Sequence, residues 1–150
     1  MQFSNIIIPN KEYQKQWTEV VSNRLSVGMC SPFGLTAIIA AYTEGEEWLD
    51  QARAYIDGNI RYIEEFVKEN LPKAAVMDCQ GTYLVWMDLN EYCSDPEKLE
   101  ALMVQKAGIV FDEGYIFGPE GNGFERINAA TQRSTVEACM KRIKAALDTL

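Results

Sequence analysis

Hydrophobic residues recur every three or four positions along most of this chain, which is the spacing of helices that bury one face. The longest run extends from Trp48 to Leu71, with charged side chains between the apolar ones, and Pro72 ends it. Shorter runs with the same spacing predict four further helices. These cover residues 11–25, 35–45, 95–108 and 134–150.

Residue types that favour helix ends support these limits. Asn10 and Asp95 are suited to cap the helices that follow them, and Pro96 suits a first helical position. Ser134 and Glu137 have the spacing of a capping box, so we expect Ser134 to cap the last helix.

Between the helices the pattern changes to that of short strands. Residues 75–79 and 83–88 predict two strands joined by a turn at Gln80–Thr82. Residues 109–111 predict a short third strand, and residues 124–129 a fourth. From about Gly45 onward, the helices and strands follow in an order that predicts an α+β fold, a small antiparallel sheet with helices on one face.

The first part of the chain fits this fold poorly. Ile6–Ile8 are strongly β-prone and predict a strand that Pro9 ends, followed directly by a helix. A lone strand and helix do not make a domain. Residues 1–44 are therefore interpreted as a remnant of a larger domain, and residues 45–150 as a small C-terminal domain.

Charge and composition narrow the class of protein. The net charge of −8 over 150 residues argues against binding to nucleic acid or to an anionic membrane surface. No apolar run approaches the roughly 20 residues that span a bilayer, and the start of the chain lacks the pattern of a signal peptide. The scattered cysteines then fit reduced thiols in a cytoplasmic protein. They are Cys30, Cys79, Cys93 and Cys139.

The chain contains no histidine. This excludes serine–histidine and cysteine–histidine catalysis and removes the commonest ligand of transition metals. Any chemistry must use lysine, arginine, carboxylates, tyrosine or a cofactor.

Other patterns give weak candidates. No activating base accompanies Cys79, Cys93 or Cys139, so a structural role is favoured for all three. Asp112–Glu113 lack the repeated ligand spacing of a calcium loop. The glycines between residues 114 and 123 match no phosphate-binding motif and predict only a long turn.

Arg126 is the strongest candidate for binding a ligand. It lies on a predicted strand after the glycine-rich stretch, where a guanidinium could bind a carboxylate through two hydrogen bonds. An ordinary ion pair is the alternative, and the residues alone leave both open.

Several motifs together resemble one family of enzymes. They are Ser4–Asn10, Ala40–Tyr42 with Gly45–Leu49, Gly81–Asp88, Gly114 with Phe117–Gly118, and Arg126–Asn128 with Arg133–Ser134. In order and over nearly the whole chain, these motifs are similar to those of the pyridoxal-phosphate-dependent class I/II aminotransferases of fold type I, in the MalY/PatB-like cystathionine β-lyase branch.

This resemblance implies homodimeric enzymes that use pyridoxal phosphate on amino acids, with an active site between a large and a small domain. Residues 1–44 would then belong to the large cofactor-binding domain and the start of the interdomain helices. Arg126 matches the family's strand arginine, which binds the α-carboxylate of the substrate. The resemblance does not separate transamination from β-elimination, nor does it name the amino acid.

Two departures from the family pattern matter. The family has Cys–Pro where this chain has Thr131–Gln132. In the family, the lysine that forms the Schiff base precedes the segment that resembles Ser4–Asn10, and none of the eight lysines of this chain can be mapped onto it. We therefore expect no cofactor on this chain and no activity from the chain alone.

Three functional hypotheses follow. The first is an inactive C-terminal portion of an aminotransferase or C–S β-lyase, and the second is that a partner chain supplies the missing half. The third is a non-catalytic binding or self-association module derived from the enzyme. Because Ile6–Ile8 would lack neighbouring strands, we expect disorder of about the first thirty residues or self-association through them, and a homo-oligomer.

Overall fold

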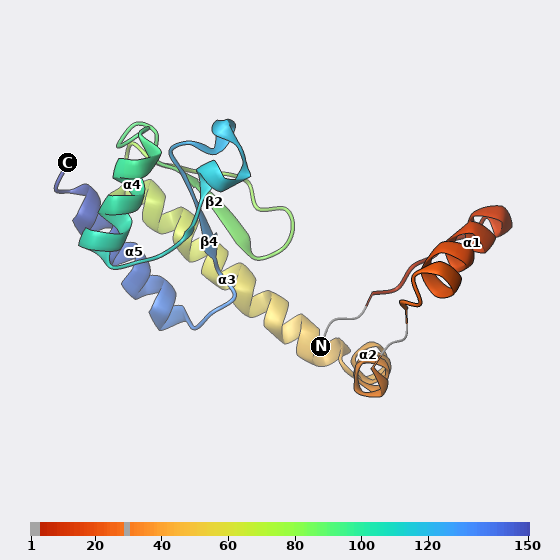
Figure 1. Cartoon of the computed structure of the whole chain (residues 1–150). Helices are drawn as coiled ribbons and strands as arrows, with labels where there is room; N and C mark the ends of the chain where they lie inside the picture. Colours follow the sequence, from red (N-terminus) through yellow and green to blue (C-terminus); the bar gives the residue numbers. More distant parts are fainter. Residues whose placement is uncertain (1–3, 29–30) are drawn as a thin grey trace. The chain divides into compact units, whose positions relative to one another are not determined.

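The computed structural model describes residues 4–28 and 31–150 (Figure 1). These form two compact units, one up to Asp50 and the other from Gln51 to Leu150. The boundary predicted between residues 44 and 45 lies slightly earlier in the chain and stays a prediction. Within the described residues, none of the helices has the length and apolar character needed to cross a membrane.

The first unit is helical. Helix α1 (Lys11–Trp17) continues into a π-helical segment, η1 (Thr18–Arg24), and α2 spans Pro32–Glu44. The predicted cap is confirmed, because the side-chain oxygen of Asn10 accepts hydrogen bonds from the backbone amides of Glu12 and Tyr13 at 2.9 and 3.2 Å.

The strand predicted at Ile6–Ile8 is wrong. Residues 4–10 have no strand pairing, and Ile7 is 87% exposed. A strand needs a neighbour to satisfy its backbone groups, and none of the described residues pairs with this segment. Self-association or disorder of the first thirty residues stays a prediction, and residues 1–3 and 29–30 lie outside the described residues.

The second unit contains the predicted antiparallel sheet. The long helix α3 (Glu46–Asn70) leads into it and ends before Pro72, as predicted. The strand order is β1-β2-β4-β3, with every neighbouring pair antiparallel. The strands are β1 (Ala75–Val76), β2 (Leu84–Asp88), β3 (Asp112–Glu113) and β4 (Phe124–Asn128).

One strand is displaced from its predicted position. Residues 109–111 form no strand, and β3 begins at Asp112, which pairs with Arg126 across the sheet. Ile109 and Phe111 instead pack their side chains against the core. Their apolar character therefore reflects burial outside the sheet and not strand pairing.

Helix α4 (Pro96–Leu102) follows the prediction. The side chain of Asp95 accepts a hydrogen bond from the amide of Lys98 at 3.3 Å, and a π-helical segment, η2 (Met103–Ala107), extends the helix. Gly108 ends it with a φ of 61°, a left-handed conformation that glycine adopts without steric cost.

Helix α5 (Arg133–Leu147) begins earlier than predicted, and the predicted capping box is wrong. Ser134 lies inside the helix, and the residue at the cap position, Gln132, makes no capping hydrogen bond with its side chain. The hydroxyl of Tyr55 on α3 instead accepts a hydrogen bond from the backbone amide of Arg133 at 2.8 Å. A side chain from another helix thus satisfies a free amide at this helix end.

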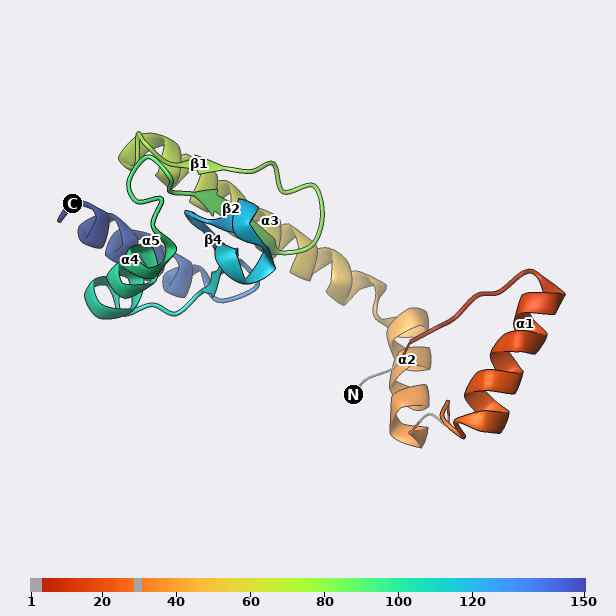
Figure 2. The same cartoon turned by 45° about the horizontal axis from the view of Figure 1, so that its top comes forward.

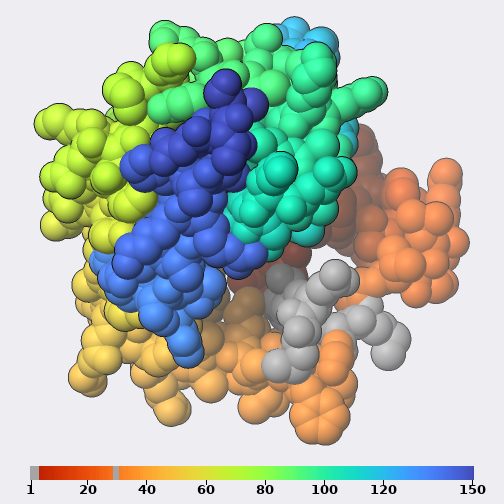
Figure 3. Space-filling view, turned by 90° about the vertical axis from the view of Figure 1, so that its left-hand side faces the viewer, coloured from red at the N-terminus to blue at the C-terminus, as the bar shows by residue number. Residues whose placement is uncertain are grey.

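The helices cover one face of the sheet, as predicted (Figure 2). Burial alternates along β2, where Val85 and Met87 are buried and their neighbours are less so. Helix α5 lies between segments of α3 and α4 on the outside of this layer (Figure 3). The largest fully buried apolar side chains are Ile63, Leu71, Val85, Met87, Leu89, Leu99, Met103, Met140 and Ile143.

Candidate functional site

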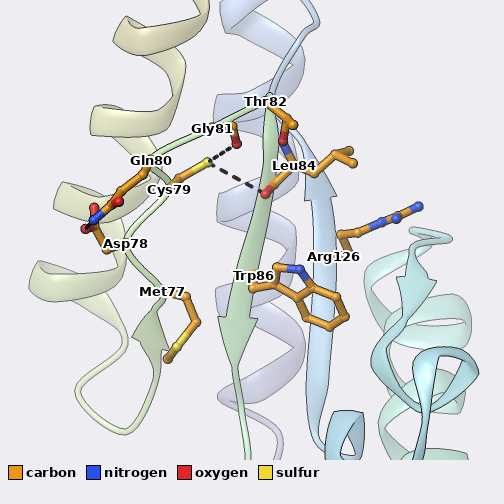
Figure 4. Close-up of a pocket in the computed structure, with 9 residues that line it drawn as sticks. All are labelled: Met77, Asp78, Cys79, Gln80, Gly81, Thr82, Leu84, Trp86 and Arg126. Atoms are coloured by element: carbon orange, nitrogen blue, oxygen red, sulfur yellow. Dashed lines mark hydrogen bonds between the residues drawn. The ribbon is translucent and has the colours of Figure 1, made fainter. Parts of the chain in front are cut away.

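The face of the sheet away from the helices carries the candidate site. Figure 4 shows the side chains of Trp86 on β2 and Arg126 on β4 on this face, with the helices behind the strands. A hollow of about 420 Å³ opens here. It is lined by Met77, Asp78, Cys79, Gln80, Gly81, Thr82, Leu84, Trp86 and Arg126.

Arg126 is held on this face by an ion pair and by an aromatic ring. Its Nε and Nη2 donate hydrogen bonds to Oδ2 of Asp112, its cross-strand neighbour, with an Nε–Oδ2 distance of 3.2 Å. The guanidinium carbon lies 4.6 Å from the centre of the Phe117 ring. The ion pair that the sequence left as an alternative is therefore present. Arg126 makes this ion pair and still lines the hollow.

Aromatic side chains support this arrangement. The Trp86 ring makes edge contacts with Phe117 and Phe124, with ring centres 5.3 and 6.2 Å apart. Phe117 belongs to a short 3₁₀ turn, η3 (Gly114–Phe117), and a second, η4 (Pro119–Gly121), follows it. A side chain on Gly114 would collide with the carbonyl of Gly121, which explains part of the glycine-rich stretch.

The opposite rim of the hollow is the loop between β1 and β2. Thr82 has a φ of 65°, which is uncommon for a residue with a side chain, and its hydroxyl accepts a hydrogen bond from the amide of Leu84 at 3.2 Å. The side-chain amide of Gln80 donates to Asp78 at 2.6 Å. The predicted turn at Gln80–Thr82 thus forms one wall of the hollow.

Sequence reasoning missed a buried acid directly behind Arg126. Glu125 points to the helix side of β4 and is 1% exposed, with no hydrogen-bond partner for its Oε2. Burial, reinforced by the nearby Glu113 and Glu100, raises its pKa to about 8. Glu125 and Ile127 lie two positions apart on the predicted strand and therefore point to the same face. An acid on the same face as an apolar residue is the signal that could have identified it.

Sequence reasoning also missed a buried amide on α3. Asn59 is fully buried, and its Nδ2 donates to the carbonyl oxygens of Ala129 and Thr131, both at 2.8 Å. These two carbonyls lie just after β4, so Asn59 fixes the segment that follows Arg126. A polar residue directly before Ile60 in the apolar stripe of the helix was the available signal.

The remaining candidates are separate from the hollow, except Cys79. Within the described residues, Cys79, Cys93 and Cys139 are free thiols, and burial raises the pKa of Cys139 to about 11, which keeps it protonated. Cys30 lies outside the described residues. No acidic or cysteine cluster suited to a metal ion occurs in residues 4–28 and 31–150.

Pyridoxal phosphate does not fit the residues that line the hollow. Binding that cofactor covalently requires a lysine against it and an acid for its ring nitrogen. All eight lysines of the chain are at least partly exposed, and none lines the hollow. Arg126 is the one cation among the lining residues, and the Asp112 carboxylate offsets its charge, so it would not balance a doubly charged phosphate.

No protein-family model matches the chain, but individual curated proteins do. The cystathionine β-lyase PatB of Bacillus subtilis is 35% identical over 147 residues, which are 98% of this chain and 38% of PatB. The MalY protein of Escherichia coli is 34% identical over 131 residues, which are 87% of this chain and 34% of MalY. The chain thus spans about a third of the length of these relatives.

Solved structures show the same relationship in three dimensions. Cystalysin from Treponema denticola, whose crystal structure contains pyridoxal 5′-phosphate, is 37% identical, with a TM-score of 0.87. The match covers 95% of this chain and 36% of cystalysin. The fold described above is therefore similar to about a third of a complete enzyme.

Proposed function

Because the chain belongs to the cystathionine β-lyase family of PatB and MalY and corresponds to its C-terminal portion, we propose that it is the substrate-binding small domain of a pyridoxal-phosphate-dependent enzyme. The reaction would be C–S cleavage or transamination of an amino acid. The parent enzyme would act as a homo-oligomer in the cytoplasm.

The observation that carries this proposal is the position of Arg126. Its guanidinium lies on the open face of the sheet, held by Asp112 and Phe117. Within the described residues, its Nη1 has no protein acceptor, and the side chain is 23% exposed. An arginine held in this way can donate two parallel hydrogen bonds to the α-carboxylate of a substrate.

The same proposal assigns the covalent chemistry to residues beyond this chain. The cofactor, when bound, would act as an electron sink for the α-carbon of the amino acid. Its Schiff-base lysine would lie in the two thirds of the family's length that this chain does not span. The chain alone would be inactive.

Cofactor labelling and complementation test this assignment. The purified chain is mixed with pyridoxal phosphate, reduced with borohydride and weighed intact, and we expect no lysine labelled at one equivalent. Co-expression with the part of PatB that this chain does not match should then restore thiol release from L-cystathionine. Clean labelling of one lysine in the chain alone would contradict the proposal.

A second experiment tests Arg126 in the chain as it stands. Acetate, the simplest carboxylate probe, is titrated while backbone amide resonances of residues 112–117 and 124–128 are followed by NMR. We expect Arg126→Gln to weaken acetate binding at least about tenfold, because it removes the charged donor. Arg61→Gln, on an exposed arginine of α3, is the control and should change nothing. An acetate response that survives Arg126→Gln would contradict the assignment.

A binding or self-association module is the alternative, and one observation favours it. Helix α2 is mostly apolar, yet Gly34 is its only buried residue within the described structure. Phe33 and Tyr42 on this helix are 79% and 82% exposed. Sedimentation of the purified chain measures its oligomeric state, and the complementation experiment measures its activity. A stable homo-oligomer that stays inactive after complementation would favour this alternative.

A further inference from the structure

Asp112 lies where it can control which ligands Arg126 accepts. The two residues face each other across β3 and β4, and only one oxygen of the Asp112 carboxylate, Oδ2, contacts the guanidinium. That oxygen occupies the Nε–Nη2 edge. The edge formed by Nη1 and Nη2 remains for a ligand.

The orientation of the guanidinium is restricted on more than one side. Phe117 covers one face of it, and the Trp86 ring packs against Phe117. Figure 4 shows the side chain of Arg126 extending away from Trp86 and from the loop that carries Gln80. Asp112 and Phe117 together therefore fix the direction in which Arg126 presents its free edge.

The charges around the site disfavour the binding of a second anion. Arg126 is the one cation among the residues that line the hollow, and Asp78 lines it as well. The side chain of Asp112 is 52% exposed and adds a negative charge at the guanidinium itself. A second ligand carboxylate beside Arg126 would meet the Asp112 carboxylate and no free cation among these residues.

We propose that Asp112 is a specificity-determining residue that restricts the Arg126 site to ligands with a single carboxylate near the arginine. The Asp112 charge offsets that of Arg126, so one carboxylate is bound mainly through directed hydrogen bonds. A short dicarboxylate such as succinate, which has no ammonium group, gains no second ion pair and is repelled, whereas each carboxylate of L-cystathionine has an ammonium group beside it. Amino acids with neutral or cationic side chains are thereby favoured over acidic ones. This inference rests on the proposed carboxylate-binding role of Arg126.

The test compares acetate with succinate in the NMR titration, at constant ionic strength and neutral pH. In the unmodified chain we expect acetate to bind about fivefold more tightly than succinate. Asp112→Asn keeps an acceptor for Arg126 but removes the charge, so succinate binding should strengthen about fivefold and the preference should disappear. Asp112→Ala also removes the acceptor and should weaken acetate binding relative to Asp112→Asn.

Asp57→Asn is the matched control, because it removes one negative charge from an exposed ion pair on α3. It should leave the acetate preference unchanged, and the amide spectra report whether each variant is folded. If Asp112→Asn leaves both affinities unchanged while Arg126→Gln abolishes binding, the inference fails and the role of Arg126 stands. If the amide resonances around Arg126 respond to neither acetate nor succinate, or if Arg126→Gln leaves acetate binding intact, the proposed role of Arg126 is wrong. The inference about Asp112 then fails with it.

Discussion

Replacing Asn59 by aspartate is expected to lower the free energy of unfolding by about 3–5 kcal/mol. The Asn59 amide donates to the carbonyl oxygens of Ala129 and Thr131, whereas a carboxylate has no hydrogen to donate and would face both carbonyls. It would also carry a charge into a position that is fully buried. Urea unfolding at neutral pH, followed by circular dichroism, measures the loss.

Asn59→Leu separates the charge from the lost hydrogen bonds. Leucine has the same branched shape as asparagine, although it is larger, and it carries no charge and leaves the two carbonyls without a donor, which should cost about 1–3 kcal/mol. The aspartate variant should therefore be clearly less stable than the leucine variant. A leucine variant as stable as the unmodified chain at neutral pH would show that Asn59 does not act as the buried donor proposed for it.

Stability is expected to fall as pH rises because of Glu125. Its pKa is raised from 4.5 to about 8 in the folded protein, mainly by burial and further by Glu113 and Glu100. Between these two pH values the folded state holds a proton that the unfolded state releases. The stabilisation is therefore complete below about pH 4.5 and is lost as pH rises through 8. We expect roughly 2–3 kcal/mol of loss, since local relaxation can bring water to the carboxylate.

Glu125→Gln should remove this dependence, because an amide does not ionise between pH 5 and 9. Urea unfolding of the variant and the unmodified chain across this pH range isolates the Glu125 contribution as their difference. Glu64→Gln removes a carboxylate from the exposed face of α3 and serves as the control. A Glu125→Gln variant that loses stability with pH as steeply as the unmodified chain would contradict the assignment.

The local pattern of the sequence was sufficient for the helices and for the type of sheet. The three-to-four-residue spacing defined α3 within a few residues, and Asn10 and Asp95 cap their helices as predicted. Both features depend on neighbours within one or two turns, so the sequence contains the necessary information. Arg126 was identified in the same way, on a predicted strand that the structure contains.

Features that depend on distant partners were not predictable. The strand at Ile6–Ile8 is absent because no described segment pairs with it, and the cap of α5 comes from Tyr55, far away in the sequence. The position of β3 was likewise set by pairing with β4 and not by the apolar run before it. Strand propensity alone does not specify which segments pair.

The sequence by itself thus determined the helices, the α+β class, the resemblance to pyridoxal-phosphate enzymes and the candidate arginine. Only the tertiary structure decided what surrounds that arginine. It placed Asp112 and Phe117 against Arg126 and buried Glu125 behind it. The reason is that hydrophobic periodicity arises within one helix or strand, whereas ion pairs and shifted pKa values arise where separate segments meet.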